Sequence, residues 1–581
     1  MTPGDWPNLV SMFLARARAG GEHPFLWSKH GGAWRSQSWA QVAGEVSAFS
    51  RGLRALGVAP GDRVVLFAEN RPNWVIADLA IMAAGAVTVP AYATGSEDDL
   101  GYLVTHSGAR AVIVSTARLA RRLAPALAGA EAVRAVIAME PIEAMNEGVP
   151  VVLWHEALAR GRERADDVAE TAARIDRHDL ACIIYTSGTG GRPKGVMLSH
   201  RAILANVQGA RRHLAAFLGE SEVFLSFLPL SHSYEHTAGL FFPIALGAQI
   251  YFAEGGDRLA ANMVEVRPTL ITCVPRLYEI LRHRILVGVR RAGGLRARLF
   301  AQAVALGRRR YEAPASLGPL DRLADRILDR LVRDAVRARF GGRLKALVSG
   351  GAPLNYDVGL FFGALGLRLL QGYGQTEAAP VVTVNPPDDN RIDSVGKPLP
   401  GVTLRIAEDG EILVRGDLVM DGYWRDPEAS AAVLTGGWLH TGDIGTLDDD
   451  GFLRITDRKK DIIVNSGGDN VSPQRIEGLL GLEPEIAEAM VYGDRRPHLV
   501  ALIVPADEIA RANPGGGEAL RRRVAEAVRR VNARLSVIER VKDFALADEP
   551  FTIENGEMTP TLKIRRHVIA ARYRDRLEGL Y

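Results

Sequence analysis

Residues 185–195 read Tyr-Thr-Ser-Gly-Thr-Gly-Gly-Arg-Pro-Lys-Gly. They follow an apolar run at 180–184, which predicts a buried strand, and precede 196–205, which predicts a helix with Ser199 near its start. Glycines let a backbone approach a ligand closely, while N–H groups, hydroxyls and Lys194 suit a polyphosphate. The spacing differs from that of a P-loop because proline precedes the lysine and glycine follows it. The stretch therefore favours a phosphate-binding loop over a glycine-rich surface turn.

The chain on both sides of this loop alternates helical and extended patterns. The predicted segments are helices at 42–56 and 74–84 and strands at 62–68, 86–92, 111–115, 133–138, 250–253, 270–274 and 346–349. This rhythm is typical of parallel sheets covered by helices, so the fold class is α/β.

The predicted secondary-structure pattern changes twice in the second half of the chain. Residues 403–415 alternate short strands with tight turns, and 442–456 predict a hairpin, which together suggest a small β-barrel-like unit. After residue 457 the pattern is that of a small α+β domain. Its predicted elements are strands at 462–464, 488–492 and 499–504 and helices from 473 and over 518–535. We expect a large N-terminal domain at 1–457 and a small C-terminal domain at 458–581.

The composition is that of an ordinary globular protein. Among 581 residues 47% are hydrophobic, 24% are charged, and the formal net charge is +3, so nothing overall calls for nucleic acid. Cys182 and Cys273 lie in apolar contexts and predict neither disulfides nor metal ligands. The N-terminus lacks a signal pattern, and the apolar stretch 237–253 predicts a buried helix followed by a strand. We expect a cytoplasmic protein; its oligomeric state stays open.

One helical region, 276–340, is rich in arginine. Residues 282–345 hold 17 lysines and arginines against 5 aspartates and glutamates. These arginines either solvate amphipathic helices or bring the protein peripherally to an anionic membrane. The first alternative is the usual explanation of a charge run, and the sequence leaves both open.

Six further segments carry residues suited to nucleotide chemistry. They are LPLSHSYE at 228–235, SGGAPL at 349–354, QGYGQTEAAP at 371–380, WLHTGDIG at 438–445, DRKKD at 457–461 and NGEMTPTLKIRR at 555–566. An aromatic face such as that of Tyr373 can stack on a purine, a carboxylate such as Glu377 suits Mg²⁺, and Asp443 can accept both hydroxyls of a diol. Taken singly, His232 predicts a structural histidine, the 458–460 stretch a solvated turn, and Lys563 a surface lysine.

Together the seven segments resemble, in order and rough spacing, the adenylate-forming superfamily of acyl-CoA synthetases, luciferases and peptide-synthetase adenylation domains. The match extends over about 25–575 and is most like bacterial AMP-forming long-chain fatty acid–CoA ligases. The resemblance implies that ATP or AMP is bound by the following residues: Thr186, Ser187, Gly188, Thr189, Gly190, Lys194, Gly351, Ala352, Pro353, Gln371, Gly372, Tyr373, Gly374, Asp443 and Arg458.

The resemblance also implies individual roles. Lys563 would bridge the substrate carboxylate and the α-phosphate, Thr376 would contact that phosphate, and Glu377, with Thr186, would hold Mg²⁺. His232 would lie between the nucleotide and acyl pockets. Lys460 would be the hinge about which a mobile C-terminal domain rotates.

These roles imply a ligase that uses ATP, Mg²⁺ and coenzyme A to convert a fatty acid, through an acyl-adenylate, into acyl-CoA. One alternative is an acyl-AMP ligase that loads a carrier protein or uses aryl acids, although 462–471 leaves little room for the insertion typical of the former. Another is a non-catalytic acyl-nucleotide-binding protein, which the presence of all the chemistry residues disfavours.

Overall fold

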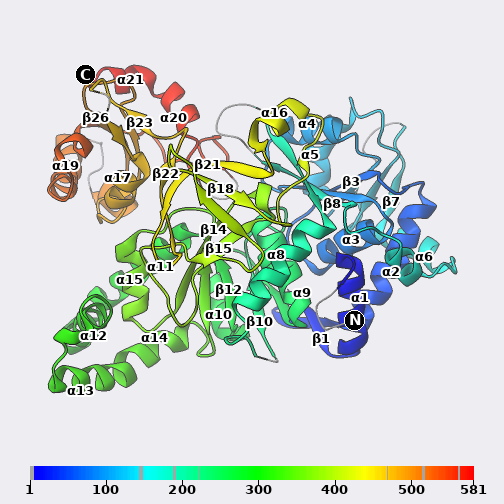
Figure 1. The fold of residues 1–581 in the computed structure, drawn as a ribbon, viewed down its shortest axis with the longest axis horizontal. Coiled ribbons are helices and arrows are strands. Elements are labelled where there is room, and N and C mark those ends of the chain that lie inside the picture. The colour runs from blue at the N-terminus through cyan, green and yellow to red at the C-terminus, as the bar shows by residue number, and fades with distance from the viewer. Residues whose placement is uncertain are drawn as a thin grey trace.

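The computed structural model describes residues 6–142, 148–186, 192–219, 221–467, 469–512, 517–559 and 563–581. Ser187, Gly188, Thr189 and Gly190 of the predicted phosphate loop lie outside the described residues. Two large sheets form the body of the molecule, a small sheet joins them, and the C-terminal part sits at the upper left of Figure 1 in orange and red.

The first large sheet has eight strands. In spatial order they are β19 (Gly422–Tyr423), β9 (Lys194–Ser199), β8 (Leu180–Thr186), β4 (Val87–Ala91), β3 (Arg63–Phe67), β5 (Ala111–Val114), β6 (Ala135–Ala138) and β7 (Val151–Leu153). From β8 to β7 neighbouring strands are parallel, and β3 to β6 are buried on both faces, as continuous apolar runs such as Val-Val-Leu-Phe in β3 require.

Helices cover both faces of this sheet. One face packs on α2 (Trp39–Ala55), α3 (Pro72–Ala83) and α6 (Trp154–Arg162), and the other on α4 (Glu97–Ser107) and α5 (Ala117–Leu127). Alternate residues of β3 divide between these two cores: Val64 and Leu66 contribute to the first, Val65 and Phe67 to the second. The predicted α/β layering is confirmed.

The second large sheet has nine strands. In spatial order they are β16 (Lys397–Pro398), β15 (Val381–Val384), β14 (Leu369–Gly374), β13 (Ala346–Ser349), β12 (Leu270–Cys273), β10 (Val223–Ser226), β11 (Gln249–Phe252), β1 (Pro24–His30) and β2 (Ala33–Ser38). The strands from β14 to β1 are parallel, and the edge strands are antiparallel.

Two groups of helices accompany this sheet. On one side are α1 (Leu9–Gly20), α8 (His200–His213), the π-helix η1 (Glu235–Phe241) and α9 (Phe242–Leu246). On the other are α10 (Leu259–Val266), α11 (Pro275–Ala292), α12 (Gly294–Glu312), η2 (Pro314–Ser316), α13 (Pro319–Leu328), the π-helix η3 (Asp329–Arg333), α14 (Asp334–Arg339) and α15 (Tyr356–Ala364). The helices α11 to α14 are the predicted arginine-rich region, which projects at the lower left of Figure 1.

The small sheet is antiparallel and contains the short strands predicted at 403–415 and the hairpin predicted at 442–456. Its strands are β17 (Thr403–Ile406), β18 (Glu411–Arg415), β20 (Leu434–Thr435), β21 (Trp438–Leu447) and β22 (Leu453–Arg458). The short helices near it and elsewhere in the body are α7 (Val168–Ala173), η4 (Thr376–Ala378) and α16 (Pro427–Val433).

The C-terminal part has its own cores, since two hydrophobic clusters consist only of residues from 463 to 580. Its strands are β23 (Ile463–Val464), β24 (Asn470–Val471), β25 (Ile486–Tyr492), β26 (Leu499–Pro505) and β27 (Val541–Leu546). Its helices are α17 (Pro473–Leu480), α18 (Asp507–Ala512), α19 (Glu518–Asn532), η5 (Val537–Glu539), α20 (Arg566–Arg572) and α21 (Arg574–Glu578). Strand β22 ends at Arg458, where the sequence predicts the domain boundary.

One local prediction is wrong. Residues 196–205 are not a helix throughout: 194–199 form strand β9, which folds back antiparallel on β8, and α8 begins only at His200 with Ser199 as its N-cap. The reason is tertiary, because β9 also pairs with β19, a strand more than 220 residues away in sequence. Among the described residues, no helix has the length and apolarity to cross a bilayer; 237–253 forms η1, α9 and β11, as predicted.

Candidate active site

A cavity of about 1580 Å³ opens between the body and the C-terminal part. Most of the predicted site residues line it, although they come from segments up to 377 residues apart. They are Thr186, His232, Gly351, Ala352, Pro353, Gln371, Gly372, Tyr373, Gly374, Thr376, Glu377, Asp443, Arg458, Lys460 and Lys563. Lys194 is not among the described residues that form this lining.

A carboxylate with two partners lies on one wall. Asp443 on β21 is 6% exposed and is the register partner of Arg458 on β22. The Arg458 Nε donates to Asp443 Oδ1 at 3.0 Å, and the Tyr373 hydroxyl donates to Oδ2 at 2.6 Å. Burial and the Asp443 charge raise the pKa of Tyr373. Asp443 and Arg458 are 15 residues apart in sequence, and the β21–β22 hairpin brings them side by side, as predicted.

A second group of polar side chains lies at the C-terminal end of β14. Thr376 on η4 is 7% exposed, and its hydroxyl oxygen is 2.8 Å from that of Ser233. The Glu377 carboxylate accepts a 2.9 Å hydrogen bond from Tyr423 on β19. The Lys194 ammonium lies 4.8 Å from the centre of the ring of Tyr423, the same residue that donates to Glu377.

Sequence reasoning missed Ser233 and Tyr423 as site residues. Ser233 follows His232 in the segment 228–235, so the sequence motif could have indicated it. Tyr423 belongs to a two-residue strand whose place beside β9 depends on long-range pairing, so no local pattern marks it.

Glycines let the backbone form another part of the wall. Gly351 has φ +84°, a conformation that side chains rarely adopt, and it lies just after β13 at the carboxyl end of the parallel sheet. A Cβ on Gly374 would lie 1.7 Å from the Pro380 carbonyl oxygen, so the turn after β14 closes only with glycine there. This bare edge is the usual binding place in α/β sheets.

An apolar branch of the same cavity runs along the body. Its walls come from α8, β10, η1, α9, β12, β13 and β15. The residues are Val207, Ala210, Leu214, Phe224, Thr237, Ala238, Phe242, Leu270, Ile271, Val348, Val381 and Val384. The rings of Phe224 and Phe242 meet edge-to-face with centroids 6.1 Å apart. A branch of this chemistry suits a hydrocarbon chain.

His232 and Lys563 lie where the polar and apolar regions meet. Burial, together with the charge of the nearby Lys563, lowers the pKa of His232 to about 3, so the imidazole is neutral at pH 7. Its Nδ1 accepts a 3.1 Å hydrogen bond from the Tyr234 backbone. This fixes Nε2 as the protonated nitrogen, available as a donor.

The Lys563 side chain keeps contact with solvent through the cavity, yet protein atoms surround it. Desolvation lowers its pKa to about 8, and the Arg458 charge acts in the same direction; Asp443, Asp461 and Glu377 oppose the change. The ammonium is therefore largely protonated at pH 7 and is attracted to carboxylates on two walls of the cavity.

The loop that carries Lys563 is braced from within the C-terminal part. The Thr559 backbone N–H donates to the Lys563 carbonyl at 2.8 Å, and Arg565 N–H donates to the Glu557 carbonyl at 2.7 Å. The Glu557 side chain is fully buried and accepts from Arg572 at 3.0 Å. Lys460 lies in the turn that follows β22 and lines the cavity on its other side.

The polar groups that line the cavity suit a nucleotide bound together with Mg²⁺. Among the described residues there is no cluster of three histidine, cysteine or carboxylate side chains that would hold a metal alone. Glu377 offers one carboxylate, which is the usual protein contribution where phosphates and water complete the Mg²⁺ shell. The Ser349 hydroxyl and the Gln375 amide nitrogen are buried without a partner near this edge, and both are suitable donors to a bound ligand.

Comparisons with known proteins agree with this geometry. The family model of the AMP-binding enzymes matches residues 13–424, and that of the AMP-binding enzyme C-terminal domain matches 460–581. The chain is 35% identical to the long-chain-fatty-acid–CoA ligase FadD15 of Mycobacterium bovis, over 100% of this chain and 98% of that protein. It is 30% identical to the chloroplastic long-chain-fatty-acid–[acyl-carrier-protein] ligase AEE15 of Arabidopsis thaliana, over 99% and 87%.

Among solved structures, the fold is similar to that of the A-PCP didomain of a carboxylic acid reductase from Segniliparus rugosus in complex with AMP. The TM-score is 0.81 at 22% identity, covering 99% of this chain and 82% of that one. This likeness concerns the fold of both the body and the C-terminal part.

Proposed function

We propose that this chain, which belongs to the AMP-binding enzyme family, activates a long-chain fatty acid with ATP and then transfers the acyl group to coenzyme A. The observation that carries the proposal is one cavity in which Lys563, Thr376, Glu377 and Asp443 meet an apolar branch. The products are acyl-CoA, AMP and pyrophosphate.

In the first half-reaction a carboxylate oxygen attacks the α-phosphorus of ATP, and the bond to pyrophosphate breaks. Lys563 offsets the repulsion between the two anions, Thr376 donates to the α-phosphate, and Asp443 with Arg458 binds the ribose hydroxyls. Tyr373 and the backbone at Gly351 hold the adenine. Mg²⁺, bound by Glu377 with Thr186 as a second candidate ligand, would neutralise charge on the phosphates.

In this proposal, residues 186–190 and Lys194 bind the β- and γ-phosphates, which leave as pyrophosphate. In support, Thr186 lines the cavity at the end of β8, and Lys194 faces it in register across the hairpin. Tyr423 contacts both groups: its ring lies 4.8 Å from the Lys194 ammonium, and its hydroxyl donates to Glu377.

In the second half-reaction the thiol of coenzyme A attacks the acyl carbon, and AMP leaves. Lys563 fills the place near His232 that the acceptor needs, so the C-terminal domain, residues 458–581, rotates about Lys460 between the steps. In the conformation described here Lys563 lies in the cavity, which is the arrangement required for adenylation.

The acceptor defines a second candidate. The second candidate is an acyl-AMP ligase that loads a carrier protein. It is supported by 30% identity to the carrier-protein ligase AEE15, whereas the chain is 35% identical to the CoA ligase FadD15. Incubating the protein with ATP, Mg²⁺, a chain-length series of acids and either coenzyme A or a carrier protein distinguishes the two. Acyl-CoA and AMP in equal amounts support the proposal; acyl-AMP without acyl-CoA favours the second candidate, and no pyrophosphate release overturns both.

We also propose that the protein associates peripherally with anionic membrane through the arginine-rich region 282–345. The support is the charge of that region and the proposed substrate, since long-chain fatty acids partition into bilayers. We propose a cytoplasmic location together with this membrane association.

A further inference from the structure

An apolar stripe is exposed along α13 and η3, at the outer edge of the arginine-rich helices. Leu320, Leu323, Ile327 and Leu331 are 82%, 56%, 50% and 61% exposed. Their spacing of three or four residues places them on one side of the helix. Leu328, about a quarter turn round the helix from the stripe, is buried at 4% exposure. Leucines exposed together in this way are unusual on a monomeric surface.

A row of arginines runs beside the stripe. Arg322, Arg326 and Arg330 recur every four residues and are all exposed. Within the described part of the chain no ion pair involves any of the three. The surface therefore joins exposed hydrocarbon to unneutralised positive charge.

The acidic residues of the region point elsewhere. Asp321, Asp325 and Asp329 also recur every four residues but pair inward, with Arg309 at 3.1 Å, Arg310 at 2.9 Å and Arg337 at 2.8 Å respectively. The other two carboxylates, Glu312 and Asp334, pair with Arg308 and Arg337. Asp321 and Asp325 thus hold α13 against α12, all five carboxylates have arginine partners of their own, and the row Arg322, Arg326 and Arg330 is left exposed.

The stripe is held on a fixed support. Arg333 is fully buried and donates to the carbonyls of Ala303 on α12 and Ala364 on α15 at 2.9 and 2.7 Å. It also pairs with Asp325 at 2.5 Å. One guanidinium therefore ties η3 to α12, α13 and α15 and holds the segment that carries the stripe in place.

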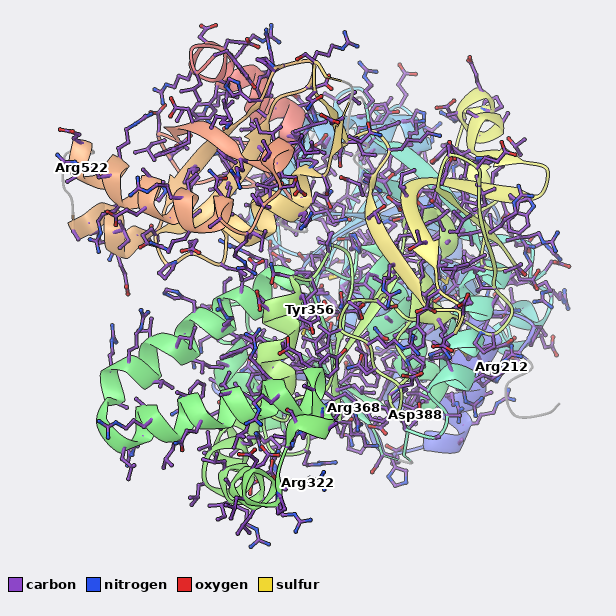
Figure 2. All side chains as sticks on the ribbon, turned by 60° about the vertical axis from the view of Figure 1, so that its left-hand side comes forward. Arg212, Arg322, Tyr356, Arg368, Asp388 and Arg522 are labelled. Atoms are coloured by element: carbon purple, nitrogen blue, oxygen red, sulfur yellow. The ribbon has the colours of Figure 1, made fainter. Side chains whose placement is uncertain are left out.

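We propose that the α13–η3 face inserts into the surface of an anionic lipid bilayer, with the leucines entering the acyl boundary and Arg322, Arg326 and Arg330 contacting lipid phosphates. This inference deepens and rests on the proposed membrane association by naming the face that makes it. An apolar stripe flanked by cationic side chains is the arrangement of helices that lie in the bilayer interface. Helix α13 lies at the outer edge of the molecule (Figure 1), and Arg322 points away from the body at that edge (Figure 2), as contact with a broad, deformable surface requires.

Co-sedimentation with vesicles tests the inference on the full chain. Vesicles of phosphatidylcholine alone are compared with vesicles of phosphatidylcholine and phosphatidylglycerol in equal parts, at low and high salt. Wild type is expected to bind the anionic vesicles and to be released by salt. The variant Arg322→Gln/Arg326→Gln/Arg330→Gln should bind about 100-fold more weakly, from about fivefold per arginine. The variant Leu323→Ser/Ile327→Ser should also lose binding.

A matched control removes the same charge elsewhere. Arg522, Arg523 and Arg529 are exposed on α19, and Figure 2 shows Arg522 at the upper left edge of the molecule and Arg322 at its lower edge. The variant Arg522→Gln/Arg523→Gln/Arg529→Gln should bind like wild type. Equal loss in the control and the α13 variant would overturn the assignment of the face.

Two other outcomes also overturn the inference. One is the absence of wild-type binding to anionic vesicles at low salt. The other is a wild-type dimer, seen by light scattering, that the Leu323→Ser/Ile327→Ser variant dissolves without any effect on vesicles, which would make the stripe a contact between two copies. Ligase activity on detergent-dispersed fatty acid is measured in parallel: the variants should retain it, and its absence in wild type would contradict the proposed function whatever the vesicles show.

Discussion

The ammonium of Lys563 shows how one residue acquires its proposed role from its surroundings. It is a lysine of the C-terminal part, and in the structure it lies near Arg458 at the domain boundary and near Asp443 and Glu377 from the body. The lowered pKa reflects that enclosure. A charge in such a cavity interacts with a substrate carboxylate and phosphate more strongly than it would in water.

Lys563→Ala should separate the two half-reactions. Formation of acyl-AMP, followed as pyrophosphate release, should fall by about 100-fold or more because a positioned charge on the reacting groups is lost. Formation of acyl-CoA from supplied acyl-AMP should stay within a few-fold of wild type. Lys542→Ala, at an exposed position on β27, is the matched control. Equal loss of both half-reactions would contradict the role given to Lys563.

A second residue, Glu235, is buried in η1 behind the acyl branch. Its carboxylate accepts hydrogen bonds of 2.6 Å from Ser226 and from Thr272, which lines the cavity. Burial raises its pKa to about 7 despite these two donors. The group is therefore neutral in mildly acidic solution and becomes charged near neutral pH.

Because the folded pKa lies above the unfolded one, the stability that Glu235 contributes is fully present below about pH 4.5. It is lost as the pH rises through about 7. Glu235→Gln keeps the shape but cannot ionise, so it should remove this loss. Between about pH 5 and 8, the free energy of unfolding of wild type should fall by about 2 to 3 kcal/mol relative to the variant. Denaturant unfolding at several pH values measures the difference; parallel curves for the two proteins would refute the prediction.

At the scale of elements, helix α8 supplies one wall of the apolar branch. Val207 and Ala210 of α8 and Leu214, directly after it, recur at helical spacing and line the cavity together with Phe224 and Leu270 of the sheet. Alanine is the smallest of the three helix residues, so the position of Ala210 controls how much room the branch has.

Ala210→Phe should shift the preference of the enzyme to shorter acids. If the ring excludes two or three methylenes at about 0.8 kcal/mol each, kcat/KM for the longest acids should fall roughly 10- to 100-fold, with short acids nearly unaffected. Arg212→Phe, on the exposed side of the same helix (Figure 2), should change neither. A uniform loss over all chain lengths would mean that Ala210 does not border the acyl chain.

The hairpin of β8 and β9 shows where local patterns reach their limit. The apolar run of β8 and the start of α8 after Ser199 were predictable because burial and helical spacing are local signals. The run Lys-Gly-Val-Met-Leu-Ser suits a helix or a strand about equally. Residues 194–199 form a strand because they pair with both β8 and β19.

At the scale of the whole molecule, polar contacts join the C-terminal part to the body. Asp357 on α15 accepts from Arg308 and from Arg534, each at 2.9 Å, and so links α12 to the C-terminal part. Arg276 on α11 lies 3.4 Å from Glu488, and Asn355 donates to the Gly478 carbonyl at 3.2 Å. These contacts stabilise the arrangement in which Lys563 lies in the cavity.

Arg534→Ala should lower the rate of acyl-AMP formation about two- to fivefold, as expected for loss of one partly exposed ion pair, while thioester formation from acyl-AMP is unchanged or faster. Arg534→Lys should restore most of the loss. The control is Arg521→Ala, which breaks the 2.8 Å pair with Asp543 inside the C-terminal part. Single-turnover kinetics with labelled ATP gives the rate; identical effects of Arg534→Ala and Arg521→Ala would argue against a role for this contact.

The sequence by itself determined the α/β class, the order of most strands and helices, and the residue types gathered at the site. These follow from periodicity and from motifs whose chemistry is local, such as the carboxylate of Asp443 and the glycine-rich segment 371–374. Only the tertiary structure decided that Ser233 and Tyr423 join Thr376 and Glu377, that β9 is a strand, and that the leucines of α13 face outward. The physical reason is that contacts between distant segments depend on how whole elements pack, and an amphipathic helix shows its two faces in sequence without showing what covers either one.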